Sequence, residues 1–282
     1  MTRSTFDIRR PLHAPAGLPR DLKATAVFDP KHSALLALPE VQALMDADET
    51  PIPDARDREG YYGDRHIEYW LSGYLDWSKV KPLLEPGGGR YLDLGGASGR
   101  VVRHAAGTPG LECWLTDINI NLVDWVDQYF ARPVHTYQTR IMPVMPLEDA
   151  SFSVISAFSV FTHLDTDEVQ WLLEMRRVLK TGGYLYMTVN DENVWALLEN
   201  PQWAWLRESI TRGNREEEFA KAVQNPLVPT RSVWEYSDAA GYNMNTFLHS
   251  AYIKRKWGSL MDIVDYRVAD HGYQSVVVLK KR

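Results

Sequence analysis

The sequence predicts an α/β protein built around a doubly wound, mostly parallel sheet of seven strands. From about residue 85 the chain alternates short apolar segments with segments of helical periodicity, an order typical of parallel strands joined by crossover helices. The apolar segment 90–94 runs directly into a loop of small residues, 95–99, as happens where a ligand contacts backbone. The chain ends in two strand-like segments joined by residues 270–273, a link so short that only an antiparallel hairpin fits. We therefore expect one antiparallel terminal strand.

Residues 1–84 are expected to form an N-terminal arm and a helical cover. Prolines recur through the first 55 residues and exclude long helices there. Between residues 61 and 84, aromatic and aliphatic residues recur at helical spacing, until prolines and glycines interrupt the pattern at 86–89. One or two helices should therefore lead into the first strand.

Residues 85–190 are expected to form the core of the sheet, with helices after the first, second and fourth strands. A terminal helix and hairpin within 251–282 should complete it. The predicted strands are 90–94, 112–117, 134–138, 154–158, 183–189, 265–269 and 274–280.

Residues 191–250 interrupt this alternation. The stretch is too long for a simple crossover, and it is unusually rich in aromatic residues. We interpret it as an inserted lid or substrate region.

Composition excludes several classes of partner. With 31 basic and 37 acidic residues the net charge is -6, so nucleic acid is disfavoured. The single cysteine, Cys113, cannot form an intramolecular disulfide and lies in a predicted strand, which fits a cytoplasmic protein. No apolar run suggests a membrane segment, and the eight histidines lack a metal-ligand spacing. The oligomeric state is left open.

Two carboxylates indicate the ligand. Asp93 precedes Gly95, where a carboxylate repels a pyrophosphate and favours a cation; S-adenosylmethionine carries two cations, an ammonium and a sulfonium. Asp117 follows about twenty residues later, at the end of the second predicted strand, where it can accept both ribose hydroxyls. It can equally cap a helix beginning near Asn119, and both roles can hold together. Ile118 fits either the adenine face or the core.

Four blocks of sequence resemble the class I S-adenosylmethionine-dependent methyltransferases of small-molecule type. They are residues 92–100, 116–118, 145–155 continuing to 158–164, and 175–185. The resemblance implies that the first block holds the methionine part of the cofactor, that the acid of the second holds the ribose, and that the third lies beside the transferable methyl. The cofactor-binding residues that it implies are Asp93, Gly95, Gly96, Ala97, Gly99, Asp117, Ile118, Phe158 and Ser159.

Two positions depart from the family pattern. Ala97 replaces the middle glycine of the first block, which is tolerated if its φ is negative. Ser153 replaces the aspartate usual in the fourth strand. A helix beginning near Ser98 should direct its free amides at the cofactor carboxylate.

His163 closes the third block and is the candidate general base, with a capping or packing role as the alternative. Four further residues are candidates for the substrate site, each with packing as the competing explanation. They are Tyr62, Trp70, Trp195 and His249.

The sequence therefore favours transfer of a methyl group from S-adenosylmethionine to an oxygen or nitrogen of a small polar metabolite, such as a sugar or natural product. A non-catalytic cofactor-binding or scaffold protein of the same fold is one alternative. An NAD(P)-dependent oxidoreductase is another, disfavoured because Ala97 and Arg100 stand where the dinucleotide fingerprint needs glycine.

Overall fold

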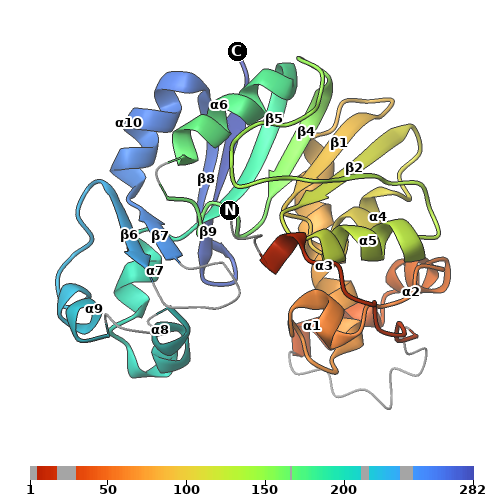
Figure 1. Ribbon diagram of the computed structural model, residues 1–282, viewed down its shortest axis with the longest axis horizontal. Helices are drawn as coiled ribbons and strands as arrows, with labels where there is room; N and C mark the ends of the chain where they lie inside the picture. Colours follow the sequence, from red (N-terminus) through yellow and green to blue (C-terminus); the bar gives the residue numbers. More distant parts are fainter. Residues whose placement is uncertain (1–4, 18–29, 166, 211–215, 236–243) are drawn as a thin grey trace.

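A mostly parallel sheet of seven strands forms the centre of the protein (Figure 1). The computed structural model describes residues 5–17, 30–165, 167–210, 216–235 and 244–282. The strand order is β3-β2-β1-β4-β5-β9-β8, and β9 is antiparallel to both of its neighbours, so the predicted fold is confirmed. The strands are β1 (Gly89–Leu94), β2 (Leu111–Asp117), β3 (His135–Gln138), β4 (Phe152–Ala157), β5 (Leu179–Val189), β8 (Asp262–His271) and β9 (Gln274–Lys280).

Helices cover both faces of this sheet. Successive strand residues point to opposite faces, so Tyr91 joins one apolar core and Leu92 the other. The Tyr91 face packs against α3 (His66–Val80), α4 (Val102–Ala105) and α5 (Ile120–Tyr129). The Leu92 face packs against α6 (Glu168–Val178) and α10 (Ser250–Leu260). Burial on both faces explains the continuously apolar strands.

The N-terminal segment forms short helices and a small core of its own. The helices α1 (Pro30–Leu36) and α2 (Pro39–Asp46) both begin at a proline, which is tolerated in the first helical turn. Together with Ile52 and Trp70 they form a core against α3. No described helix before residue 55 exceeds eight residues, as the prolines predict. The remaining short elements are 3-10 turns, η1 (Thr5–Asp7), η3 (Ala55–Arg58) and η4 (Lys81–Leu83).

The described part of the insertion folds around a separate core. It contains α7 (Glu192–Leu197), η5 (Pro201–Trp203), α8 (Ala204–Ile210), α9 (Glu216–Ala222) and the hairpin β6 (Arg231–Glu235) and β7 (Met244–Leu248). Backbone hydrogen bonds attach β7 to the main sheet: Thr246 N donates to Thr162 O at 2.7 Å, and Leu248 N to Asn190 O at 2.8 Å. Residues 211–215 and 236–243 of this insertion lie outside the described ranges. Its role as a lid stays a prediction.

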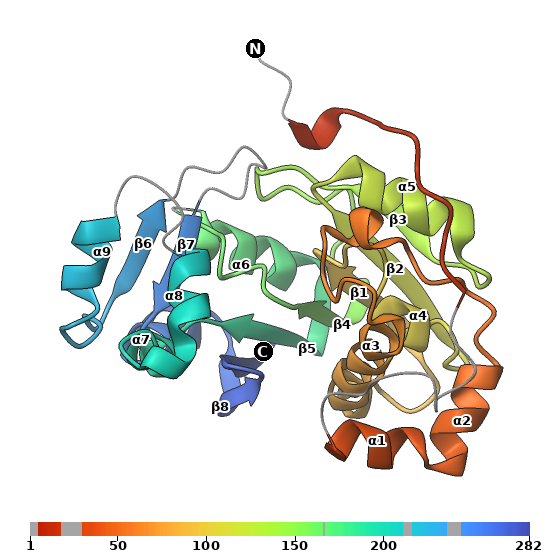
Figure 2. The same ribbon diagram turned by 90° about the horizontal axis from the view of Figure 1, so that it is seen from below.

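The N-terminal lobe (α1 to α3) and the insertion lobe (α7 to α9, β6 and β7) lie on either side of one edge of the sheet (Figure 2). Asn190, which follows β5, contacts β7 of the insertion lobe, so β5 ends at this edge. Because β1, β2 and β4 run parallel to β5, they end at the same edge. Parallel sheets bind ligands at that edge. Within the described ranges, no helix combines the length and apolarity needed to cross a bilayer.

Candidate active site

The glycine loop after β1 turns through left-handed backbone conformations. Gly95 and Gly99 have φ of 69° and 84°, and Ala97 has φ of 48°. The condition under which alanine is tolerated there without strain, a negative φ, is therefore not met at Ala97. Both glycines are also required by packing, because a Cβ would lie 2.4 Å from Val160 at Gly95 and 2.3 Å from Phe130 at Gly99. Gly96 has the same constraint, with Leu115 at 2.7 Å.

The helix after this loop starts later than predicted. α4 begins at Val102 rather than Ser98 and has four residues. The Ala97 amide, instead of pointing freely at a ligand, donates to Asp117 Oδ2 at 2.9 Å. A tight loop tied to β2, rather than a helix terminus, lies at the candidate cofactor site.

Asp117 holds the loop and the start of α5 together. Its Oδ1 accepts a hydrogen bond from Asn119 N at 2.9 Å, and the N-cap of α5 is Asn119 itself. Burial raises the pKa of Asp117 to about 7. Each carboxylate oxygen has a second lone pair, so the bonds to amides leave acceptor capacity for the predicted ribose contact.

Asp93 is 2% exposed, and only one of its two carboxylate oxygens has a hydrogen-bond partner. The Tyr91 hydroxyl donates to Ser156 Oγ at 2.7 Å, and the Ser156 hydroxyl donates to Asp93 Oδ1 at 2.9 Å. Asp93 Oδ2 is buried and has no hydrogen-bond partner. Burial raises the pKa of Asp93 to about 6, and the hydrogen bond from Ser156 opposes this rise.

Arg58 is a buried charged residue near the glycine loop that the sequence did not single out. It is 2% exposed, and its guanidinium lies 4.9 Å above the Tyr69 ring. The Tyr69 hydroxyl is in turn 3.4 Å from Ser98 Oγ in the glycine loop. Arg58 Nη2 bonds to Gly63 O and His66 Nδ1, whereas Nε and Nη1 are buried without partners. In a segment as charged as 54–59 nothing distinguishes this arginine from a solvated one.

The turn after β4 carries the other predicted residues. Ser159 has φ of 57°, and its hydroxyl donates to Gln274 Oε1 at 3.0 Å. The centroid of the Phe158 ring lies 5.2 Å from that of His271 at the end of β8. His163 Nδ1 lies 2.9 Å from Met244 O, so Nδ1 carries the proton and Nε2 is the accepting nitrogen. Burial lowers the pKa of His163, which keeps the imidazole neutral.

The four candidate substrate residues are not brought together. Trp70 is 0% exposed with its indole N–H donating to Asp48, and Trp195 is 5% exposed with its N–H donating to Asn225 O. Both side chains are therefore packed, which is the alternative that the sequence left open for them. His249 caps α10, with Nδ1 accepting from Ala251 N at 3.0 Å. Tyr62 has φ of 64°, and its ring centroid lies 6.1 Å from that of Tyr69.

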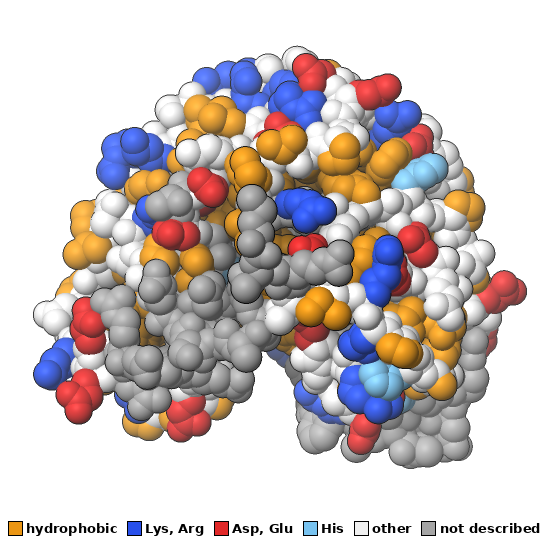
Figure 3. Space-filling view, viewed as in Figure 1, with side chains coloured by type: hydrophobic (Ala, Val, Ile, Leu, Met, Phe, Trp, Pro, Cys, Tyr) orange, Lys and Arg blue, Asp and Glu red, His pale blue; other side chains and the backbone are white. Residues whose placement is uncertain are grey.

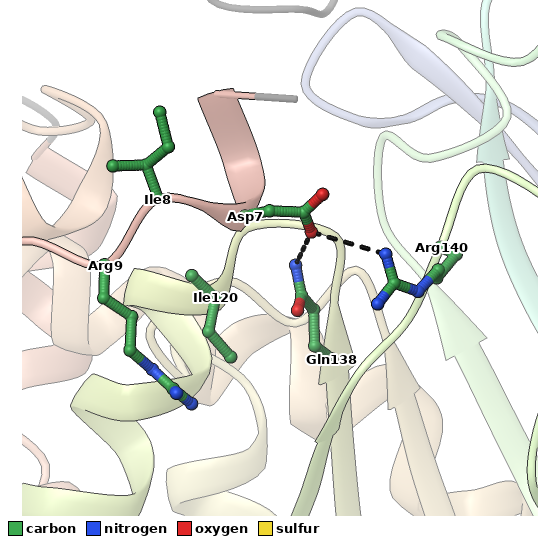
Figure 4. A pocket seen from close by; sticks show the side chains of 6 residues that line it. All are labelled: Asp7, Ile8, Arg9, Ile120, Gln138 and Arg140. Atoms are coloured by element: carbon green, nitrogen blue, oxygen red, sulfur yellow. Dashed lines mark hydrogen bonds and ion pairs between the residues drawn. The ribbon is translucent and has the colours of Figure 1, made fainter. Parts of the chain in front are cut away.

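An N-terminal strap, residues 5–10, crosses the start of α5 and the end of β3. It borders an open cavity of about 670 Å³, in which Asp7 points toward Gln138 and Arg140 (Figure 4). Gln138 Nε2 also donates to Ile118 O at 2.9 Å. The strap therefore lies beside Ile118, a contact that the irregular N-terminal sequence did not predict.

Cys113 is 2% exposed on β2, and burial raises the pKa of its thiol to about 12, so its predicted packing role is confirmed. Among the residues that the structure describes, no group of three or more His, Cys, Asp or Glu side chains could hold a metal ion.

Part of the chain matches a known domain family, and its fold matches solved structures. Residues 92–187 match the methyltransferase domain family. An S-adenosylmethionine-dependent methyltransferase from Methanosarcina mazei is 14% identical, with 72% of this chain and 96% of that chain covered and a TM-score of 0.51. A protein from Pyrococcus horikoshii is 16% identical, with 78% of this chain and 93% of that chain covered and a TM-score of 0.54. A putative methyltransferase solved in complex with the Haloferax volcanii Trm112 methyltransferase activator is 15% identical, with 80% of this chain and 94% of that chain covered and a TM-score of 0.52.

These structural likenesses show the fold, while the family match spans the glycine loop, Asp117 and the turn after β4. The match to the methyltransferase domain family implies S-adenosylmethionine as the cofactor. The chain contains a methyltransferase domain over residues 92–187 and has the class I S-adenosylmethionine-dependent methyltransferase fold.

Proposed function

We propose that this enzyme transfers the methyl group to an oxygen or nitrogen of a small polar metabolite, in a site formed by the glycine loop, Asp117 and the turn after β4. The observation that carries the proposal is a pair of buried charges of opposite sign beside the loop. Asp93 Oδ2 and Arg58 Nε and Nη1 are all buried without hydrogen-bond partners. The single buried thiol of Cys113 suits a reducing compartment such as the cytoplasm.

A buried charge without a partner is costly, so a protein keeps such a pair where a ligand completes it. The amino-acid end of S-adenosylmethionine carries an ammonium and a carboxylate. Asp93 would hold the ammonium and Arg58 the carboxylate. Asp117, which keeps acceptor capacity at its carboxylate, would hold the ribose.

The cofactor supplies a methyl group bonded to a sulfonium. When the methyl group bonds to the acceptor, the sulfur departs as a neutral thioether. Alignment of the acceptor with that methyl contributes about 7 to 11 kcal/mol to lowering the barrier. For a hydroxyl acceptor, His163 Nε2 takes the departing proton while Nδ1–H stays bonded to Met244 O. General-base catalysis of this kind contributes about 10²- to 10⁴-fold.

Calorimetric titration with S-adenosylhomocysteine and with 5′-methylthioadenosine, which lacks the amino-acid end, tests the proposal. Wild type should bind both. Arg58→Met should lower the affinity for S-adenosylhomocysteine roughly tenfold to a hundredfold, as expected for the loss of a charge-assisted hydrogen bond. The affinity for 5′-methylthioadenosine should be unchanged.

Arg56→Ala is the matched control, because the Arg56 side chain lies on the same turn and is 67% exposed. It should leave both affinities unchanged. A wild type that binds neither ligand overturns the function, and an Arg58 variant that loses both ligands equally has lost the fold of the cover rather than one contact.

A further inference from the structure

We propose that the methyl acceptor is a hydroxyl-bearing ring that stacks on an aromatic corner formed by Trp203, Trp205 and Tyr273. This inference rests on the proposed function and adds the acceptor subsite to it. The ring centroids of Trp203 and Trp205 are 5.8 Å apart at 35°. Tyr273 lies 6.1 Å and 6.0 Å from them, at 75° and 71°. Two indoles and a phenol thus form two walls nearly at right angles.

Trp205 is unusual in being exposed. Its exposed fraction is 55%, whereas the other nine tryptophans are buried or half-buried. A tryptophan buries more apolar area than almost any other side chain when a partner covers it. An indole held by neighbouring rings yet open to solvent is therefore a surface on which a ligand can stack.

The corner is connected to the point of methyl transfer. Tyr273 is followed by Gln274, which is 5% exposed and accepts the hydrogen bond from the Ser159 hydroxyl at 3.0 Å. Ser159 belongs to the turn after β4, which also carries His163. The corner is thereby linked through Gln274 to the turn that carries the residues of the proposed chemistry.

Polar groups of the corner suit a hydroxylated ligand. Burial raises the pKa of Tyr273, and the nearby Tyr61 hydroxyl adds to the rise, so two phenols lie near each other. Tyr61 comes from the N-terminal lobe and is 64% exposed. The corner therefore has a polar neighbour from the N-terminal lobe. Figure 3 shows a notch at the lower edge of the molecule, where its two sides part.

The class of ligand follows from these groups. An aromatic wall binds a flat aromatic ring or the C–H face of a pyranose, and phenols hydrogen-bond to the hydroxyls of either. The hydroxyl that loses its proton to His163 gains the methyl group as the sulfonium becomes a thioether. A sugar and a phenolic compound share this chemistry, and the experiment separates them.

The test uses the enzyme saturated with S-adenosylhomocysteine and two probes, methyl β-D-glucopyranoside and phenol, followed by tryptophan fluorescence and calorimetry. Ring-sized ligands of this kind bind with a Kd of about 1 to 10 mM. At least one probe should bind in that range, and the preferred probe identifies the source of the ring.

Trp205→Ala should lower the affinity for the preferred probe about tenfold. Trp205→Phe keeps a stacking ring and should retain most of that affinity. Trp114→Phe is the matched control, because Trp114 is half-buried and stacks on His135 at the far side of the sheet. It should leave probe binding unchanged.

The affinity for S-adenosylhomocysteine should be the same in all these variants. A wild type that binds the cofactor product but neither ring overturns the inference and leaves the proposed function intact. Equal ring binding by wild type and Trp205→Ala also overturns it. Failure to bind S-adenosylhomocysteine would instead overturn the proposed function.

Discussion

Asp93 combines a cost to folding with a gain in binding. Burial raises its pKa from an ordinary 3.8 to about 6, so the folded protein holds this proton more tightly than the unfolded chain does. As pH rises from about 4 to 6 the unfolded chain ionises first, and the folded state loses relative stability. Above pH 6 the cost is complete, and the carboxylate is then available to a cation. Affinity for S-adenosylmethionine should be full above pH 6 and should fall below it.

Asp93→Asn should remove both effects. Asparagine keeps an oxygen for Ser156, so above pH 6 the free energy of unfolding of the ligand-free protein should rise by up to about 3 kcal/mol, the equivalent of the pKa shift. Cofactor affinity should fall and lose its dependence on pH between 5 and 7. Urea unfolding and calorimetry across that range measure the two quantities. Unchanged affinity at pH 7.5 would exclude Asp93 as the ammonium site.

Ala97 lies in a backbone conformation that glycine adopts without strain. Its φ of 48° costs an alanine about 1 kcal/mol, so Ala97→Gly should raise the free energy of unfolding by about that amount. Ala150, exposed with φ of 49°, is the control. Ala150→Gly should give the same gain in stability. Only Ala97→Gly should also raise the affinity for S-adenosylhomocysteine, because only at Ala97 does the removed methyl group lie in the glycine loop.

Among the elements, α3 is the one whose close packing positions the loop. A Cβ at Gly73 would lie 1.9 Å from the Arg100 carbonyl oxygen, so Gly73→Ala must push the helix from the loop. We expect a loss of about 1 to 3 kcal/mol in the free energy of unfolding and weaker cofactor binding. Gly258 in α10 has its nearest neighbour at 3.5 Å, so Gly258→Ala should instead stabilise by up to about 1 kcal/mol. Urea denaturation compares the two helical glycines, and equal effects would contradict the packing argument.

At the scale of the whole molecule, one ion pair joins three distant segments. Arg100 in the loop lies 2.6 Å from Asp76 in α3, and His271 in the terminal hairpin lies 3.1 Å from the same Asp76 oxygen. Arg100→Met removes the strong partner of a buried carboxylate and should cost about 3 to 5 kcal/mol. In Arg282–Asp262 both side chains are more than half exposed, so Arg282→Ala should cost about 0 to 1 kcal/mol. Thermal unfolding distinguishes the two, and a small effect at Arg100 would show that the three segments are held by apolar packing alone.

The elements of the sheet could be predicted because their signals are local. The strands β1, β4 and β5 are marked by apolar runs, and the hairpin before β9 is marked by its short link, so each signal lies within a few residues of sequence. The substrate residues could not be predicted in this way. Trp70 lies in α3 and Trp205 in α8, yet Trp70 is completely buried and Trp205 is mostly exposed. Which face of an element meets the core depends on what packs against it.

By itself the sequence determined the order of strands and helices along the chain and the glycine loop, and it predicted Asp93 and Asp117 as ligands of the cofactor. Only the tertiary structure decided that Arg58 is buried beside that loop, that Ala97 is left-handed, and that Tyr273 meets two tryptophans about seventy residues earlier in the chain. The physical reason is that hydrogen bonding and periodicity act between near neighbours in sequence. Burial, by contrast, and with it the cost of an unpaired charge, exists only once distant segments have come together.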